Sequence, residues 1–509
     1  MKMRTITLAA VFGLSAIFPA LGATQSLDVH AFGAVGDGKR MDTGAIQKAI
    51  DQANASGGGT VVLAGGTFLS GSLELKSHVT LRVEKGAVLL GSAVRDDYSK
   101  ALGRFALIVA KGQDDIAVCG GGVIDGQGRM LAENVLKMAK AKMFPDTLHA
   151  NRADESNRPM VIWFFRCRNV SVRDITLKDS ACWVQTYVDC VDLLLDHVTV
   201  RSVAYWNNDG IDLVDSRNVR VSDCDINSAD DGICLKSSRE GGACEDVIIE
   251  KCRVRSSASA LKFGTASVGG FKRVKVRELD VYDTFRSAVA LEAVDGATLE
   301  DVDISGITAK NTGNALFIHV GQRRGNVGII RNVTISDMSV EVPEGSPDAG
   351  YDFPGPLVRI PHNPIPSSIS GLPGHPVRNV TLRNITITVP GGGNRKRARI
   401  PLNRLANVPE KEKDYPEFSM FGELPAWGFY CRHAEGLTFQ NVKLRSRERD
   451  YRSALVADDV KGLTLEGFQV LSAGEEPVIV LNKVDGFRMI DSQPPSGTRQ
   501  FILKQNGSR

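Results

Sequence analysis

The sequence has no strong charge bias and, after its first residues, no long apolar run. Its 62 lysines and arginines nearly balance 59 aspartates and glutamates, giving a formal net charge of +3. Such a balance does not supply the positive field with which proteins attract nucleic acids or acidic membranes. No segment after Leu21 reaches the roughly 18 uninterrupted apolar residues of a membrane-spanning helix. We therefore expect a soluble protein with no nucleic-acid partner and no membrane partner.

Paired cysteine motifs are also absent. The cysteines form an odd set without a CxxC spacing, which argues against a zinc site or a complete disulfide framework. We expect no metal and no cofactor. Most cysteines fall in strand-like segments, which predicts small apolar side chains stacked in an interior. One bridge within residues 224–252 stays open if the compartment is oxidising. The nine cysteines lie at positions 119, 167, 182, 190, 224, 234, 244, 252 and 431.

The N-terminus has the pattern of an export signal. Two basic residues precede an apolar run from Ile6 to Leu21, and the run ends in small residues. A charged start, a short apolar core and small residues at the cleavage point are typical of a signal peptide. We predict a signal peptide over residues 1–22, a single domain over residues 23–509, and a periplasmic or extracellular location. A retained N-terminal anchor is the alternative.

A short strand-like pattern recurs from residue 169 onward. Each copy alternates branched apolar and polar residues, which predicts strands with one buried face. The early copies start 22, 27, 28, 27 and 25 residues apart, and a period in the twenties predicts a solenoid. Leucine-rich and helical repeats share such periods, but leucine is not fixed here and no copy has a helical pattern. We therefore predict an all-β fold, a single right-handed parallel β-helix. The copies begin at Asn169, Val191, Asn218, Asp246, Arg273, Thr298, Asn332, Asn379, Leu437 and Leu463.

Two kinds of segment interrupt the repeat. Residues 45–53 place five apolar side chains on one helical face after the capping candidate Asp42. This pattern predicts an amphipathic helix that covers the open first coil. Four longer stretches are rich in glycine, proline and charge, and we predict them to be loops, which in repeat proteins often carry function. They span about residues 127–158, 322–330, 342–376 and 390–428.

Three aspartates occupy equivalent corners of adjacent predicted coils. Asp209 lies in Asn-Asn-Asp-Gly, and Asp230 and Asp231 lie in Ala-Asp-Asp-Gly, about one coil further along the chain. Stacking should therefore bring the three carboxylates together. Their mutual repulsion should raise at least one pKa and leave a protonated acid beside ionised bases. Such a set can hydrolyse a glycosidic bond, although either motif alone could be a turn sequence.

These motifs resemble those of glycoside hydrolase family 28, the polygalacturonase-like, pectin-degrading β-helix enzymes. The resemblance rests on Phe32-Gly-Ala-Val-Gly-Asp-Gly, on Asn207-x-Asp209 and on Asp230-Asp231, and it extends over roughly residues 27–340. It implies an inverting hydrolase that needs no metal, with Asp230 as the general acid. Asp209 and Asp231 would orient and deprotonate the water, and Asn207 would contact the substrate. An inverting mechanism would separate the acid and the base by about 6.5–9.5 Å.

Two motifs of that family are missing from this sequence. Its Gly-His-Gly turn should fall near residues 257–259, which are Ser-Ala-Ser. Its Arg-x-Lys pair, which the resemblance implies binds the sugar carboxylate, should fall near Val289 and Leu291. Cleavage is therefore supported, whereas ordinary polygalacturonan specificity is weakened.

Basic side chains elsewhere could replace these substrate contacts. Lys236 follows the aspartate pair on its own coil, and Lys262 lies one coil later. The alternative is that both simply neutralise the aspartates. Arg323, beside Arg324 in a glycine-flanked loop, could bind a sugar carboxylate through two hydrogen bonds, unless the loop is merely solvated.

Aromatic and polar residues provide further candidates. Trp183 and Gln185 lie at a corner two coils before the aspartate pair, and residues 415–433 concentrate aromatic rings and end in His433. Aromatic faces suit the apolar faces of sugar rings. Covering the end of the core is the alternative role of residues 415–433.

Three classes of function remain open at this point. The leading one is an inverting glycosidase on plant-type pectic polysaccharide or oligosaccharide, exo-acting if the long loops close the groove, or a variant on a rhamnogalacturonan-type or non-uronate glycan. A β-helix polysaccharide lyase would instead use Asp230 and Asp231 as calcium ligands. A non-catalytic carbohydrate-binding β-helix is the third. We expect a monomer in each case.

Overall fold

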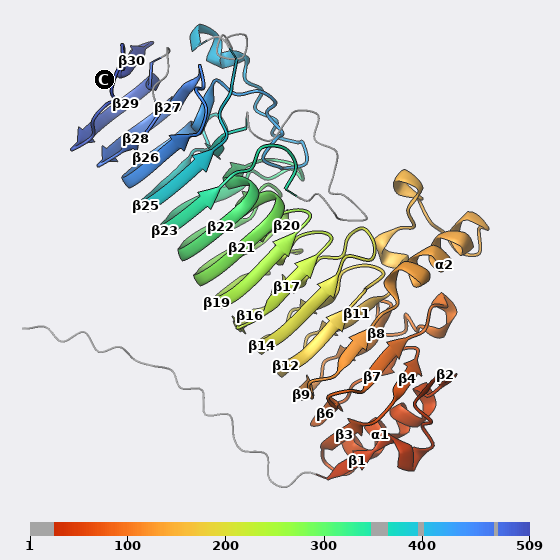
Figure 1. Cartoon of the computed structure of the whole chain (residues 1–509). Coiled ribbons are helices and arrows are strands. Elements are labelled where there is room, and N and C mark those ends of the chain that lie inside the picture. Colours follow the sequence, from red (N-terminus) through yellow and green to blue (C-terminus); the bar gives the residue numbers. More distant parts are fainter. Residues whose placement is uncertain (1–24, 348–364, 395–401, 473–476) are drawn as a thin grey trace, which may run out of the picture.

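The computed structural model describes residues 25–347, 365–394, 402–472 and 477–509. In these ranges the chain winds into a long stack of coils, and the strands β1 to β30 pair in parallel from coil to coil (Figure 1). The predicted right-handed parallel β-helix is confirmed. The predicted signal peptide lies outside the described residues. Within the described ranges, no helix has the length and apolar character needed to cross a bilayer.

One continuous sheet, which we call the site sheet, carries the predicted aspartates along one side of the stack. Its strands follow one another coil by coil through pairings such as β15 with β18 and β18 with β20. It consists of β5 (Leu73–Glu74), β8 (Ala106–Lys111), β11 (Met160–Phe165), β13 (Gln185–Val188), β15 (Ile211–Val214), β18 (Ile233–Ser237), β20 (Leu261–Ser267), β24 (Ser367–Ser370), β30 (Ile502–Gln505), and parts of β21 (Gly270–Ala293), β22 (Thr298–Val320), β26 (Ala426–Ser446), β27 (Ser453–Glu466) and β29 (Ile479–Ile490).

The remaining strands, together with the other parts of the long ones, form the other faces of the coils. Several strands are long because they run through a corner from one face to the next. They are β1 (Ser26–Asp28), β2 (Asp37–Met41), β3 (Gly59–Leu63), β4 (Thr67–Ser70), β6 (Val79–Val83), β7 (Val88–Gly91), β9 (Asp114–Cys119), β10 (Val123–Asp125), β12 (Arg168–Lys178), β14 (Val191–Ser202), β16 (Arg217–Ser222), β17 (Asp225–Ser228), β19 (Cys244–Ser256), β23 (Ile329–Glu341), β25 (Val377–Val389) and β28 (Gln469–Val470).

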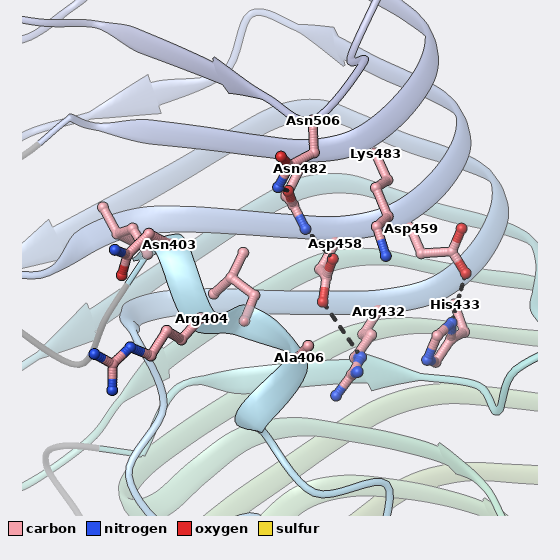
Figure 2. A pocket seen from close by; sticks show the side chains of 12 residues that line it. Asn403, Arg404, Ala406, Arg432, His433, Asp458, Asp459, Asn482, Lys483 and Asn506 are labelled. Atoms are coloured by element: carbon pink, nitrogen blue, oxygen red, sulfur yellow. Dashed lines mark hydrogen bonds and ion pairs between the residues drawn. The ribbon is translucent and has the colours of Figure 1, made fainter.

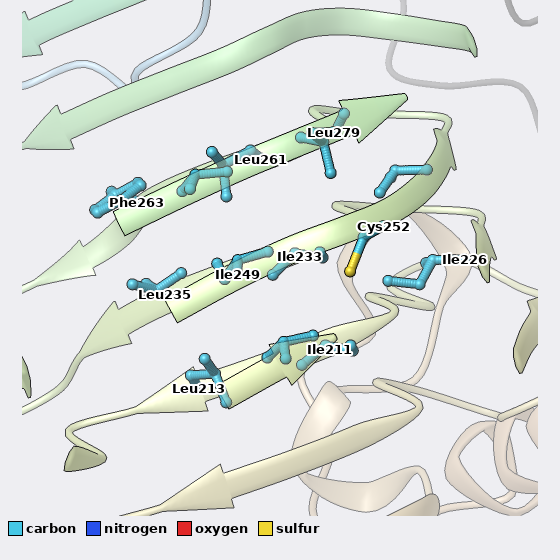
Figure 3. Close-up of a cluster of buried hydrophobic side chains, with 14 of the residues drawn as sticks. Ile211, Leu213, Ile226, Ile233, Leu235, Ile249, Cys252, Leu261, Phe263 and Leu279 are labelled. Carbon is cyan, nitrogen blue, oxygen red and sulfur yellow. The ribbon is translucent and has the colours of Figure 1, made fainter. Parts of the chain in front are cut away.

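Apolar side chains stack in rows inside the coils because alternate residues of each strand point inward. Directly beneath the site, Leu213, Leu235 and Phe263 form one such row on β15, β18 and β20, and all three are fully buried (Figure 3). Burying a side chain of this size contributes about 1.5–3 kcal/mol. The row therefore gives the site sheet a rigid support. All nine cysteines are likewise buried and unpaired, including Cys224 and Cys252.

Stacked asparagines and aspartates form a corner of the coils. Asn218 donates to the Asp192 carboxylate 26 residues earlier, Asn332 to Asp301 31 residues earlier, and Asn379 to Asn332 47 residues earlier. All five have positive φ, a conformation that Asn and Asp tolerate better than most residues. This ladder explains why most repeat copies begin near Asn or Asp, and the spacing grows where loops are inserted between corners.

A helix covers the first coil, as predicted. Helix α1 (Thr43–Ala55) buries Ile46, Ala49, Ile50 and Ala53 against the first strands. Asp42 is the N-cap residue, as predicted, but its side chain accepts no hydrogen bond from the first turn of the helix. Its carboxylate instead accepts from the backbone amides of residues 35 and 36 and so holds the preceding turn.

The prediction of a loop over residues 127–158 is wrong for its first part. That part forms helix α2 (Gly128–Lys140), which lies on one side of the stack (Figure 1). Leu131, Val135 and Met138 are buried at helical spacing, so the apolar face of α2 packs on the coils. After α2 the chain is irregular apart from two short 3-10 turns, His149–Asn151 and Glu155–Asn157. Further 3-10 turns lie at Val29–Phe32, Arg95–Asp97 and Leu402–Asn407.

The segment that precedes β26, from residue 402 onward, packs on the later coils of the site sheet. Phe418, Phe421 and Leu424 belong to one buried cluster with Phe317 and Tyr430, whose side chains project from the sheet. Parts of the predicted loops 342–376 and 390–428 lie outside the described residues. The predicted aspartates lie instead on the earlier part of the site sheet, around β15 to β20.

Candidate active site

The structure brings Asp209, Asp230 and Asp231 together. Asp209 precedes β15 and the pair precedes β18, and one carboxylate oxygen of each lies within 4.8 Å of the others. Asp209 and Asp231 are both 3% exposed, whereas Asp230 is partly exposed and can meet a ligand. The nearest oxygens are closer than the predicted 6.5–9.5 Å. The separation therefore does not by itself favour inversion.

The glycines that follow Asp209 and Asp231 are required by close packing. A Cβ atom on Gly210 would lie 2.5 Å from the Ile226 side chain, and one on Gly232 would lie 2.3 Å from the Val254 side chain. Neither glycine has a positive φ. The Asp-Gly pairs are therefore points where adjacent coils touch, rather than left-handed turns.

Two buried lysines neutralise two of the aspartates. The Lys236 ammonium lies 3.0 Å from Asp209 and 2.9 Å from Asp212, and the Lys262 ammonium lies 3.1 Å from Asp231. Burial alone would lower the lysine pKa values, but the carboxylates raise both well above the usual range. Both lysines therefore serve the carboxylates, which was the alternative to a direct sugar contact.

The carboxyl groups are held in different protonation states. Burial, followed by repulsion from Asp209 and Asp231, raises the pKa of Asp230 to about 7. Burial also raises the pKa of Asp209, against the opposing effect of Lys236. The pKa of Asp231 is lowered instead, because Lys262 and Lys236 outweigh its burial. A carboxyl group with a raised pKa thus lies within 4.8 Å of one with a lowered pKa, as general acid–base chemistry requires.

Asn207 contacts Asp230 and is itself held by a buried arginine. Its amide nitrogen lies 3.5 Å from an Asp230 oxygen, and its amide oxygen accepts from Arg158 at 2.7 Å. Arg158 is 2% exposed, and it fixes the amide so that the nitrogen faces Asp230. Sequence analysis missed Arg158, because it lies 49 residues before Asn207 in a segment predicted to be a loop.

Tyr415, the first residue of the aromatic segment 415–433, lies beside Lys262 together with Arg286 and Glu292, which sequence analysis did not select. The Tyr415 hydroxyl accepts from Lys262 at 3.3 Å, and the Arg286 guanidinium lies 5.8 Å from the centre of the same ring. Glu292 lies 4.0 Å from Lys262, and burial raises its pKa to about 7. Arg323 also approaches the Tyr415 ring, at 5.9 Å, but its guanidinium is bound by a buried carboxylate through two hydrogen bonds of 3.0 Å.

The positions expected for an Arg-x-Lys pair cannot contact a substrate. Val289 and Leu291 point into the interior and are fully buried, in register with Leu261 and Phe263. The outward positions of this strand are Ala290 and Glu292, so the sheet carries no basic pair here. Val289 and Leu291 are apolar because they belong to the core. The Arg-x-Lys pair is therefore missing at these positions.

Trp183 and Gln185 have different surroundings. The partly exposed Trp183 ring lies 4.8 Å from the Lys236 ammonium, at the edge of the aspartate cluster. Gln185 is fully buried, and it bonds to the Tyr187 hydroxyl and the residue 210 carbonyl. Its predicted role as a surface contact for substrate is wrong, because its amide serves the packing between coils.

His433 lies away from the aspartates. It borders a separate cavity of about 220 Å³ on the last coils, where Asp459 contacts its Nδ1 at 2.6 Å (Figure 2). Glu410 contacts its Nε2 at 3.1 Å. Five strand spacings separate β18 from β26, which amounts to roughly 24 Å. The structure therefore does not support the prediction that His433 contacts a substrate bound at Asp230.

The donor set does not suit a calcium ion. The three aspartates are close enough to share a cation, but Lys236 and Lys262 already lie within 3.1 Å of two of them. Calcium prefers six to eight oxygen ligands. Two ammonium groups in contact with the same carboxylates would repel such an ion.

Part of the chain is similar to known proteins. Residues 55–285 match the family model described as "Glycosyl hydrolases family 28". The chain is therefore similar to this family over 231 of its 509 residues. It is 25% identical over 336 residues to a "Probable polygalacturonase" of Vitis vinifera, covering 62% of the chain and 61% of that protein. An "Exo-poly-alpha-D-galacturonosidase" of Dickeya chrysanthemi is 24% identical over 249 residues, covering 41% of each.

The fold comparison extends further along the chain. A hyperthermoactive exopolygalacturonase from Thermotoga maritima superposes with a TM-score of 0.58 at 20% identity, covering 72% of this chain and 87% of that one. At this identity the likeness shows the fold alone. The family match ends at residue 285, so it includes the aspartates and Lys262 but not Glu292, Arg323 or Tyr415.

Proposed function

We propose that the protein hydrolyses glycosidic bonds in pectic polysaccharide or oligosaccharide. Asp230 protonates the leaving oxygen, and Asp209 and Asp231 orient the attacking water, whose proton passes to the ionised Asp231. The observation that carries this proposal is the cluster of three carboxyl groups, with one oxygen of each within 4.8 Å of the others and Lys262 beside only one of them, Asp231. The family and the names of the relatives support the pectic substrate, although the chain spans only 61% and 41% of the lengths of the two relatives above.

The pH dependence of activity tests the acid. Because Asp230 must be protonated and its pKa is raised to about 7, kcat/KM should fall as the pH rises above about 7. The ionised Asp231, whose pKa is lowered, should keep the enzyme active well into the acidic range. Initial rates on a galacturonic acid oligomer from pH 3 to 9 measure both limbs. An activity that stays constant to pH 9 would contradict the role of Asp230.

The stereochemistry of the product tests the mechanism. The resemblance to the family implies inversion, so the first product formed should carry the anomeric configuration opposite to that of the cleaved bond. Proton NMR of the anomeric signals during the first minutes, before mutarotation, distinguishes the outcomes. Retention would require a covalent intermediate on one of the aspartates. An absorbing unsaturated product would indicate the lyase.

The identity of the sugar at the cleavage point is a further part of the proposal. The absence of a basic pair at Val289 and Leu291 of β21 favours a hydrolase with a changed preference, for a rhamnogalacturonan-type or non-uronate glycan. Activity on a panel of pectic oligosaccharides compares this preference with that for polygalacturonate. Export, a monomeric state and an exo mode of attack belong to the same proposal.

A further inference from the structure

A cavity of about 330 Å³ adjoins the aspartates on the side of the earlier coils. It is bordered by Arg104, by residues of the segment 149–158 and by Asn207. Its volume lies within the roughly 300–1,000 Å³ of small-molecule sites. Asn207 is shared between the cavity and the catalytic cluster, because its amide reaches Asp230 at 3.5 Å. A sugar residue in this cavity would therefore be a direct neighbour of the proposed acid.

The cavity is lined by more positive than negative charge. Arg158 directs its hydrogen bonds to the carbonyls of residues 153, 181 and 206 and to the Asn207 amide, all of them neutral acceptors. Among the described residues, no carboxylate lies within ion-pair distance of Arg104, Arg152 or Arg158. The two acidic residues of the lining are Asp154 and Glu155, and Asp154 already accepts from the Ser156 amide at 2.8 Å.

Two of the arginines can meet a ligand. Arg104 and Arg152 are partly exposed, whereas Arg158 is buried and fully engaged. The Arg152 guanidinium lies 5.5 Å from the Trp206 ring, which is 36% exposed. A guanidinium group binds a carboxylate through paired hydrogen bonds, and an aromatic face suits the apolar face of a sugar ring. Cation and ring together match a sugar that carries a carboxylate.

We propose that this cavity is a subsite for one uronic acid residue of the substrate, whose carboxylate binds Arg104 and Arg152. The inference rests on the proposed function and extends it. Through this subsite the chain would recognise an acidic sugar on the side of the cleavage point away from β21. On β21 itself, the basic pair expected at Val289 and Leu291 is missing. Arg158 acts as a positioning residue that links the subsite to Asp230 through Asn207.

Removal of the two exposed arginines tests the subsite. In the double variant Arg104→Gln/Arg152→Gln, KM for a galacturonic acid trimer should rise about 10-fold or more, and more than kcat falls, because charge-assisted hydrogen bonds to the carboxylate are lost. KM for the fully methyl-esterified trimer should rise much less, because this trimer carries no negative charge. Arg173→Gln, an exposed arginine on β12, is the matched control and should behave as the wild type.

A binding measurement separates the subsite from catalysis. In an Asp230→Asn background, calorimetric titration with the galacturonic acid trimer should show binding that weakens about 10-fold or more when both arginines are replaced. If the wild type hydrolyses the trimer but neither KM nor binding depends on the arginines, the subsite is wrong and the proposed function stands. If binding depends on them but no pectic substrate is cleaved, the proposed function is wrong and the subsite stands. Equal losses on the acidic and esterified trimers would also overturn the subsite.

Discussion

Replacing Asp230 by asparagine should lower kcat by about 10²–10⁴-fold, because the leaving oxygen would no longer receive a proton. The side chain keeps its shape and its contact with Asn207, so the substitution removes chemistry rather than structure. KM should change much less than kcat, since the loss concerns the transition state. Steady-state kinetics on a pectic oligosaccharide that the wild type cleaves measure both quantities.

The stability of the same variant provides an independent check. The pKa of Asp230 is raised to about 7 in the folded protein, above the value of an unfolded chain, so ionisation of Asp230 destabilises the fold as the pH rises. Asparagine cannot ionise. The variant should therefore unfold at the same temperature as the wild type at pH 4, where the carboxyl group is protonated, and at an equal or higher temperature at pH 8.

A nearby aspartate serves as the control for the Asp230 variant. Asp223 is exposed at a corner between β16 and β17 and has positive φ, which asparagine tolerates. Asp223→Asn should leave kcat, KM and the unfolding temperature unchanged. If Asp230→Asn kept wild-type kcat, or lost activity only because it unfolds, Asp230 would not be the acid.

The sequence predicted the fold well because one periodic signal is repeated many times. Each strand alternates inward and outward residues, and each corner of the ladder selects Asn or Asp for its left-handed backbone, as at Asn218 and Asn332. Every coil repeats the same constraint, so local irregularities do not hide it. The aspartates were found for the same reason, because Asp209 and Asp231 occupy equivalent places one coil apart.

The parts that could not be predicted depend on contacts between segments far apart in the sequence. Tyr415 meets Lys262 across 153 residues, and no repeat relates the two. Gln185 and Leu291 lie on strands whose alternation was visible, but the sequence did not reveal which face points inward, and a shift of one residue exchanges the two faces. Helix α2 was hidden among charged residues, although Leu131, Val135 and Met138 carry its apolar face.

Replacing Lys236 by methionine should cost about 3–5 kcal/mol of stability at neutral pH, because removing one partner of a buried ion pair leaves the other charge unpaired. Lys236 is 7% exposed and contacts both Asp209 and Asp212, and Asp212 is fully buried. Urea-induced unfolding monitored by circular dichroism measures the loss. Lys310→Met, at an exposed position of β22, is the control and should change stability by much less.

The pH dependence of this loss identifies its cause. Without Lys236 the pKa values of Asp209 and Asp212 should rise further above those of the unfolded chain, so the destabilisation should be largest above neutral pH and should shrink towards pH 4, where both carboxyl groups are protonated. The wild type already shows the direction, since burial raises the pKa of Asp212 to about 6 even beside the lysine. Adding Asp212→Asn to Lys236→Met should recover part of the stability at pH 7.5 and little at pH 4. A loss that is independent of pH and unaffected by Asp212→Asn would show that Lys236 stabilises the coil through packing of its aliphatic chain, rather than by neutralising the carboxylates.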